Sequence, residues 1–175
     1  MMKVLIVLAC MISTPITLFD FTEESSQDSW QVEDDRVMGG ISQGRFKITE
    51  EGYGHFHGYV TTESNGGFSS IQRKMDKMDL GDATVVKLRV KGDGKTYKFR
   101  IKADQDTYHS YQQAFETSGK WEIVSLPLAD FSANYRGRNV DVPNFDQESI
   151  EFIRFMIANK KKQEFSLLID KVWVD

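Results

Sequence analysis

The sequence predicts an all-β fold, a sandwich or a barrel, from three observations. From Ile16 onward, apolar and polar residues alternate with a period of two, the pattern of strands that bury one face. Glycine, asparagine and aspartate residues stand between these runs, where turns are needed. After residue 15 no stretch has the spacing of a long helix. The chain has 175 residues, so we expect one domain over residues 16–175.

The composition limits the classes of function. Hydrophobic residues make up 40% of the chain, enough to build a packed core. The formal charge of −4 lacks the basic excess of a dedicated nucleic-acid binder, so no nucleic-acid partner is expected. A single cysteine, Cys10, excludes a disulfide framework and a thiolate zinc cluster.

The first 15 residues differ from the rest. A basic start is followed by an uncharged apolar run from Val4 to Ile12, as in a secretory signal peptide, and this run is far too short to span a bilayer. Export to the periplasm or the medium is the favoured interpretation. The alternative is a misassigned start codon, with Met11 as the true start and a cytoplasmic product.

Ten runs along the chain have the alternation of strands. In chain order they cover residues 16–21, 44–48, 55–61, 68–75, 86–91, 96–103, 108–115, 121–128, 150–157 and 165–174. Residues 130–149 have weak periodicity and are predicted to form a long loop over one end of the fold, the kind of loop that often carries function. Arg136 and Arg138 in this loop would either pin it to carbonyls and carboxylates or recognise a ligand carboxylate.

The runs 86–91 and 96–103 carry the most informative polar pattern. Gly92-Asp93-Gly94-Lys95 between them has the residues of a tight turn, so we expect the two strands to pair as a hairpin. Their polar positions would then place six cations on one sheet face: Lys87, Arg89, Lys91, Lys98, Arg100 and Lys102. Like charges on paired strands repel, so either carboxylates such as Glu116 or Glu122 compensate them or the face binds an anionic partner.

An ordered series of motifs resembles one protein family. Residues 30–44 read W-x-x-x-D-D-x-V-M-G-G-x-S-x-G and include Trp30, Asp34, Asp35, Met38, Gly39 and Gly40. The series continues with Asn65, Gly66, Gly67 and Phe68, then Asp93 in its Gly-Asp-Gly-Lys turn, Trp121, and Arg136-Gly137-Arg138. Together these motifs are similar to the signature of the complex I intermediate-associated protein 30 family.

The resemblance implies a jelly-roll β-sandwich like that of galactose-binding domains. Mitochondrial members of the family are non-enzymatic, chaperone-like assembly factors that hold intermediates of respiratory complex I, so the resemblance implies a domain that holds another protein and needs no cofactor. This sequence resembles a bacterial-type member, in which the shared domain need not have the same partner. An export signal would set this chain apart from that role. The alternative function is an exported carbohydrate-binding module of jelly-roll type, in which Trp30, Tyr53, Tyr59 and Tyr108 are aromatic residues able to stack on sugar rings.

Other candidate sites are weak by sequence. Asp34 and Asp35 would either hydrogen-bond to turn amides or bind a cation through loop oxygens. His55 and His57 would share one strand face, but no third metal ligand accompanies them. Ser69 and Ser70 lack the nucleophile-elbow motif of a hydrolase. We therefore expect no catalytic residue and no dedicated metal site.

Overall fold

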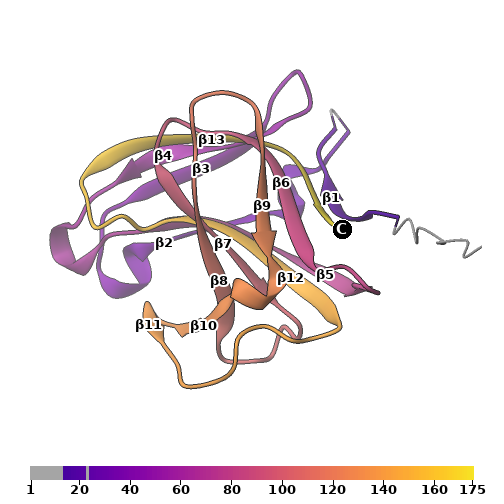
Figure 1. The fold of residues 1–175 in the computed structure, drawn as a ribbon. Coiled ribbons are helices and arrows are strands. Elements are labelled where there is room, and N and C mark those ends of the chain that lie inside the picture. Colours follow the sequence, from indigo (N-terminus) through magenta and orange to yellow (C-terminus); the bar gives the residue numbers. More distant parts are fainter. Residues whose placement is uncertain (1–13, 23) are drawn as a thin grey trace, which may run out of the picture.

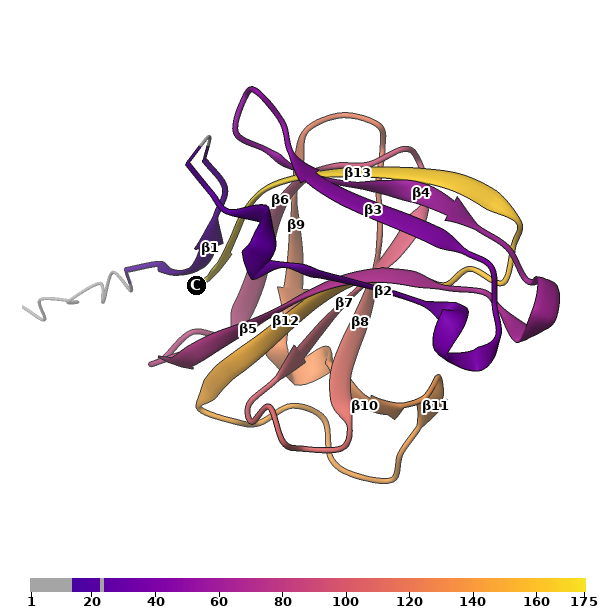
Figure 2. The same cartoon turned by 180° about the vertical axis from the view of Figure 1, so that it is seen from behind.

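The computed structural model describes residues 14–22 and 24–175, and the predicted leader therefore lies almost wholly outside the described residues. Two antiparallel β-sheets face each other, as Figures 1 and 2 show from opposite sides. The only helical elements in the described residues are 3-10 turns of three or four residues: η1 (Gln27–Ser29), η2 (Asp35–Met38), η3 (Glu63–Asn65) and η4 (Leu128–Asp130). Helices of that length do not cross a membrane.

The six-stranded sheet is built around the last strand of the chain. Its order is β3-β4-β13-β6-β9, and β1 pairs with β13 beside this path. The strands are β1 (Ile16–Asp20), β3 (Gln43–Ile48), β4 (Gly54–Val60), β6 (Val85–Lys91), β9 (Glu122–Pro127) and β13 (Gln163–Val174). In Figure 1 the C-terminus consequently lies next to β1.

The seven-stranded sheet has the order β11-β10-β8-β7-β12-β5-β2. Its strands are β2 (Gln31–Asp34), β5 (Ser69–Asp79), β7 (Thr96–Lys102), β8 (Ser110–Glu116), β10 (Ser132–Tyr135), β11 (Arg138–Asn139) and β12 (Ser149–Ile157). Its two central strands, β7 and β12, are in register from Phe152 opposite Lys102 to Met156 opposite Lys98.

The core lies between the two sheets and comes from the inward positions of the alternating runs. Val86, Leu88 and Val90 of β6 are fully buried, and so are Phe99 and Ile101 of β7. The predicted all-β fold class is therefore confirmed, and each of the ten predicted runs overlaps an observed strand. Three short strands, β2, β10 and β11, were not predicted, and the last two form within the predicted long loop.

The predicted hairpin of β6 and β7 is wrong. The strand β6 pairs with β13 and β9, whereas β7 pairs with β12 and β8 in the other sheet. The turn between them therefore crosses from one sheet to the other. Alternation predicts which side chains face inward. The alternating pattern is the same whether two strands are neighbours in one sheet or lie in two sheets that face each other, so it does not predict which strands pair. The six cations are consequently divided between the outer faces of two sheets.

Candidate functional site: a cationic sheet face

The cations of β6 are neutralised by the C-terminal strand and the residue after it. Lys87 forms an ion pair with Asp175, and Arg89 contacts Asp170 at 2.5 Å. The hydrogen bond to Asp170 raises the pKa of Arg89 above its ordinary value. The third cation, Lys91, is exposed at the end of the strand. This outer face therefore supplies counterions to two of its three cations.

The cations of β7 lie on the other sheet and have a different environment. Arg100 is 7% exposed, and the cation beside it in the register is Arg154 of β12. We call Lys98, Arg100, Lys102 and Arg154 the cationic face. The only carboxylate in an ion pair with any of the four, among the described residues, is that of Glu33, which accepts from Arg154 at 2.9 Å.

The remaining contacts of the cationic face are to neutral groups. Arg100 donates to the Asn134 side-chain oxygen at 3.3 Å, and Lys102 donates to the carbonyls of Gln105 and Thr107. Within the described part of the chain Lys98 makes no ion pair or hydrogen bond, and the Nε groups of Arg100 and Arg154 are buried without a partner. Buried guanidinium donors without an acceptor are costly, so this face has unused capacity for an anion.

Burial and mutual repulsion both act on these groups. Burial is the main reason that the pKa of Arg100 falls to about 10, and the charge of Arg154 lowers it further. Burial likewise lowers the pKa of Lys98, and Arg100 and Lys160 add to the effect. Each charge on the cationic face is therefore less favourable than in water, and a bound carboxylate would relieve that penalty.

The two carboxylates expected to compensate the cations do not do so. Glu122 lies on β9 of the six-stranded sheet, where it accepts from the backbone and hydroxyl of Ser118. Glu116 is exposed at the end of β8 and forms no ion pair within the described residues. Asp170, Asp175 and Glu33 have that role instead. They could not be assigned from sequence because the pairing of β6 and β7 was unknown.

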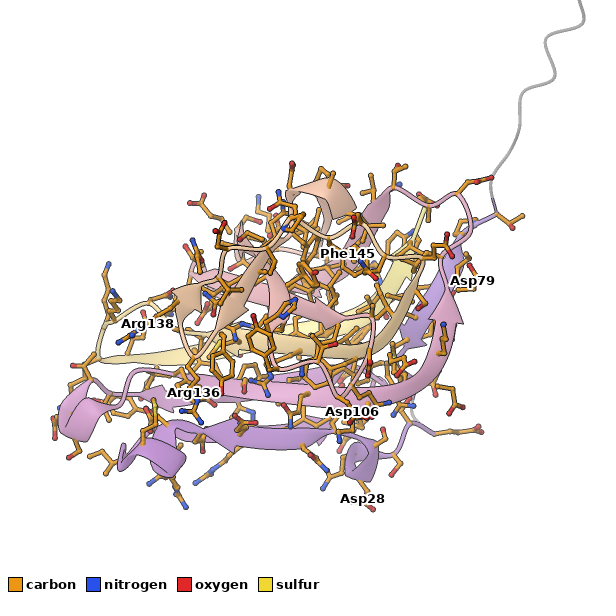
Figure 3. The ribbon with its side chains drawn as sticks, turned by 90° about the horizontal axis from the view of Figure 1, so that it is seen from below. Asp28, Asp79, Asp106, Arg136, Arg138 and Phe145 are labelled. Carbon is orange, nitrogen blue, oxygen red and sulfur yellow. The ribbon has the colours of Figure 1, made fainter. Side chains whose placement is uncertain are left out.

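Arg136 and Arg138 lie at a hairpin turn that joins β10 to β11, at the opposite end of the molecule from Asp79 in Figure 3. Arg136 and Gly137 have φ values of 49° and 79°, the positive values that a two-residue type I′ turn requires. Both arginines are exposed, and Arg136 lies over the Tyr135 ring at 5.2 Å. The turn is pinned by Asn134, which accepts from the Gly137 amide at 3.2 Å, and not by the arginine side chains.

Asp34 and Asp35 hold the signature segment together. The Asp35 carboxylate is fully buried and accepts from the Ser42 amide at 3.0 Å, the Ser42 hydroxyl at 2.5 Å and the Gly67 amide at 2.7 Å. Asp34 accepts from the Gly44 amide at 3.0 Å and the Ser69 hydroxyl at 2.7 Å. Asp35 thus binds turn amides, the first of the two interpretations, whereas the amide that Asp34 binds lies in strand β3. Within the described residues, no group of three or more His, Cys, Asp or Glu side chains is placed to hold a metal.

The glycines of the signature leave room for these carboxylates. A Cβ at Gly40 would stand 2.2 Å from an Asp35 oxygen, and one at Gly66 would stand 2.7 Å from the other oxygen. Burial acts to raise the pKa of Asp35, but the hydrogen bonds from Ser42, Gly67 and the next amide outweigh it and hold the pKa below its ordinary value. The signature is therefore explained largely by this buried carboxylate.

The other signature residues divide between core and surface. Trp30 is 5% exposed and stacks on Phe21 at 5.4 Å in the core, so it is not available to a sugar ring. Met38 is 53% exposed, and Gly39 after it has a φ of 87°.

Trp121 packs on Tyr53, with Arg89 above its ring. Phe68 is half-buried, and Asn65 ends η3.

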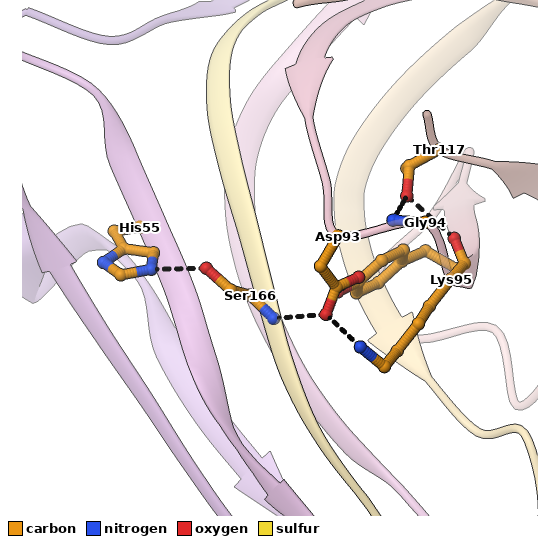
Figure 4. Close-up of polar contacts among 7 residues, drawn as sticks. His55, Asp93, Gly94, Lys95, Thr117 and Ser166 are labelled. Carbon is orange, nitrogen blue, oxygen red and sulfur yellow. Dashed lines mark hydrogen bonds and ion pairs between the residues drawn. The ribbon is translucent and has the colours of Figure 1, made fainter. Parts of the chain in front are cut away.

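Asp93 ties the crossing turn to both sheets (Figure 4). Its carboxylate accepts from the Tyr97 hydroxyl and the Ser166 amide, each at 2.9 Å, and from Lys95 at 2.7 Å. Ser166 in turn contacts His55 Nε2 at 2.9 Å. This network joins β7 to β13 across the sandwich, which accounts for the turn's place in the signature.

His55 and His57 lie on one strand face, as predicted, with stacked rings 4.2 Å apart. They line a depression of about 410 Å³ together with Arg45, Tyr59 and Glu164. Burial, then the nearby His57 and Lys47, lowers the pKa of His55 to about 4, so this ring is neutral at pH 7.

Sequence reasoning missed Arg154 and Glu33 in the candidate site. Both stand at alternate polar positions of strands, and that pattern alone marks a solvent-facing side chain. The sequence did contain one signal for Arg154, because a charged residue is unusual inside the apolar run 150–157. Its partners became evident only with the strand order β7-β12-β5-β2.

The comparisons with known proteins agree with this architecture. The model of the Complex I intermediate-associated protein 30 (CIA30) family matches residues 19–169. A family 11 carbohydrate-binding module of a Clostridium thermocellum cellulosomal cellulase is similar in structure, with a TM-score of 0.67, 17% identity, and coverage of 93% of this chain and 95% of the module. No curated protein matches the chain significantly in sequence.

Two further solved structures are similar. A C. thermocellum family 11 module in complex with a β-1,3-1,4-mixed-linked tetrasaccharide has a TM-score of 0.65 and 18% identity, over 91% of this chain and 94% of the module. An agarase has a TM-score of 0.62 and 12% identity, over 93% of this chain and 24% of the agarase chain. Such identities establish the fold alone, a jelly-roll β-sandwich of the galactose-binding type.

Proposed function

Because the chain belongs to the complex I intermediate-associated protein 30 family, we propose that it is a non-catalytic binding domain that holds another protein, an assembly intermediate of respiratory complex I. The cationic face is the surface that makes this contact. A single observation carries the assignment: four clustered cations share one ion-paired carboxylate, that of Glu33, within the described residues.

The chemistry of this face fits an acidic segment of a partner protein. Carboxylates on such a segment would accept from Lys98, and the charges of the buried Arg100 and of Arg154 would attract them. Because the attraction is between charges, binding should weaken as salt is added.

The polar side chains that are common in catalysis have structural contacts. The hydroxyl of Ser69 donates to Asp34 and that of Ser70 to the Glu33 carbonyl. His55 contacts Ser166 rather than a carboxylate. These contacts support a role in binding, which we place in a single domain over residues 16–175.

Poly-L-glutamate is a suitable probe for the cationic face. The change Lys98→Glu should weaken its binding at least tenfold and reduce the salt dependence, because it reverses a charge among the uncompensated cations. The matched control is Lys91→Glu, the same change at an exposed position of the other sheet, which should alter binding less than twofold. Equal effects of the two substitutions, or no binding by the unaltered protein, would contradict the assignment of this face.

Carbohydrate binding is a second candidate function. It is favoured by the shared fold of the family 11 modules and by two exposed tyrosines, Tyr108 in the loop before β8 and Tyr135 at the end of β10. Affinity electrophoresis separates the two functions. A carbohydrate-binding module is retarded in gels that contain its polysaccharide, whereas a domain that only holds protein migrates as it does in a plain gel.

A further inference from the structure

Five aromatic rings form a continuous ladder at the end of the seven-stranded sheet. Their order is Tyr135, Tyr108, His109, Tyr111 and Phe145, and successive ring centroids are 5.3, 4.8, 5.0 and 5.3 Å apart. Every neighbouring pair meets edge to face. The two outer rings, Tyr135 and Tyr108, are 39% and 60% exposed, whereas Phe145 at the inner end is 4% exposed. The ladder therefore runs from solvent into the core, and Figure 3 labels its inner residue, Phe145, and Arg136, the residue that follows Tyr135.

The two outer rings are held in place although they are exposed. Tyr135 is 39% exposed and ends β10, whose turn is pinned by Asn134. Tyr108 follows the turn 103–107, which Lys102 fixes through the Gln105 and Thr107 carbonyls. Exposed aromatic rings on fixed elements are typical of binding surfaces, because little side-chain freedom is lost when a ligand covers them.

A pocket of about 280 Å³ adjoins the ladder. His109 and Tyr111 line it together with Asp104, Thr107 and Gln147. Both ring nitrogens of His109 are buried and have no hydrogen-bond partner among the described residues. A neutral imidazole has one donor and one acceptor, so a group that both donates and accepts, such as a hydroxyl, would satisfy it.

We infer that the ladder and this pocket form a binding site for a neutral polysaccharide built of pyranose rings. Tyr108 and Tyr135 stack on the C–H faces of sugar rings, and sugar hydroxyls bind His109 in the pocket. The pocket wall carries one acidic side chain, Asp104, and one basic side chain, Lys102. Because neither sign of charge dominates there, the pocket favours a neutral polysaccharide over one that carries uronate or sulfate groups. This inference rests on the second candidate function.

The angle between the two outer rings predicts the shape of the glycan. The planes of Tyr108 and Tyr135 are 78° apart, so they cannot both lie flat on one plane. A flat crystalline surface needs coplanar aromatic rings, whereas a twisted single chain presents successive rings in different orientations. The site should therefore bind soluble polysaccharide chains and not crystalline cellulose.

Affinity electrophoresis in gels of mixed-linkage β-1,3-1,4-glucan, xylan or agarose tests the inference. The unaltered protein should be retarded by at least one of them, and Tyr108→Ala and Tyr135→Ala should each weaken that binding at least tenfold. The change Tyr108→Phe keeps the ring and should retain binding. Thermal unfolding should show that these variants at exposed positions remain folded.

Tyr59→Ala is the matched control, because Tyr59 lines the larger depression on the opposite sheet. Loss of binding in Tyr59→Ala but not in Tyr108→Ala would overturn the inference and leave the second candidate function standing. Absence of retardation in all three polysaccharides would overturn both. Neither outcome affects the protein-holding proposal, which poly-L-glutamate binding tests separately. Binding to crystalline cellulose by the unaltered protein would contradict the predicted shape of the ligand.

Discussion

At the residue scale, the signature of this chain is explained by buried polar contacts. Asp35 joins η2, the start of β3 and the segment before β5 through one carboxylate, and the neighbouring glycines leave it the space to do so. Such a carboxylate stabilises the fold only while it is charged and all of its donors are present. Two predictions follow from buried ionisable groups of this kind.

Asp35→Asn should lower the free energy of unfolding by about 2–3 kcal/mol, because one of the two acceptor oxygens becomes an NH2 donor that faces the backbone amide of either Ser42 or Gly67. Urea unfolding at pH 7 measures the change. Asp106→Asn, at an exposed position, is the control and should be nearly neutral.

On acidification the difference in free energy of unfolding between Asp35→Asn and the unaltered protein should shrink. The folded-state pKa of Asp35 is lowered, so its contribution is present above the ordinary aspartate pKa and is lost as the pH falls through the folded value. A difference that stays constant down to pH 2 would contradict this account.

His55 should make the fold sensitive to mild acid. Its pKa of about 4 lies below the ordinary value because burial, and then His57 and Lys47, disfavour the charged ring. The unfolded chain therefore binds more protons between about pH 6.5 and 4, and stability should fall as the pH is lowered through that window. His55→Gln should flatten this part of the stability profile, as measured by thermal unfolding at several pH values. An unchanged profile would assign the sensitivity to another group.

At the element scale, the crossing turn 92–95 decides the topology. It leads from β6 to β7 in the facing sheet, and Asp93 ties it to the Tyr97 hydroxyl and the Ser166 amide. A Cβ at Gly92 would stand 2.3 Å from Thr117 Oγ1, so the turn also packs closely on the segment after β8. A hairpin would need neither contact.

Asp93→Ala should destabilise the protein by about 1–3 kcal/mol, because it leaves the fully buried Tyr97 hydroxyl without its acceptor. A double-mutant cycle with Tyr97→Phe checks the cause. Removing the hydroxyl should be costly in the unaltered protein but close to neutral after Asp93→Ala, as measured by urea unfolding. Additive effects of the two substitutions would show that this hydrogen bond does not hold the turn.

The sequence was informative about elements and poor about their partners. Alternation located ten strands because burial of one face is a local property of each run. It missed β2, β10 and β11, which are four, four and two residues long, since so few positions cannot establish a period. It also paired β6 with β7, because a glycine-rich turn is equally suited to a hairpin and to a crossing between sheets.

At the scale of the whole molecule, the charges are distributed unequally between the two outer faces. The six-stranded sheet has its own counterions in Asp170 and Asp175, whereas the cationic face of the seven-stranded sheet has Glu33 alone in ion pairs among described residues. Sequence reasoning recognised the cations of both strands but could not divide them. Two of the six predicted cations, Lys87 and Arg89, are therefore neutralised, and Arg154 from the apolar run 150–157 joins the three cations of β7.

The central claim is that this molecule holds another protein by its cationic face. Site-specific photo-crosslinking in living cells tests it most directly, with a benzoylphenylalanine in place of Lys98 and, in a parallel strain, in place of Lys91. The account predicts crosslinks from position 98 to acidic segments of respiratory complex I subunits, identified by mass spectrometry, and none from position 91. Crosslinks to such subunits from position 91 alone, or to no protein from position 98, would contradict it.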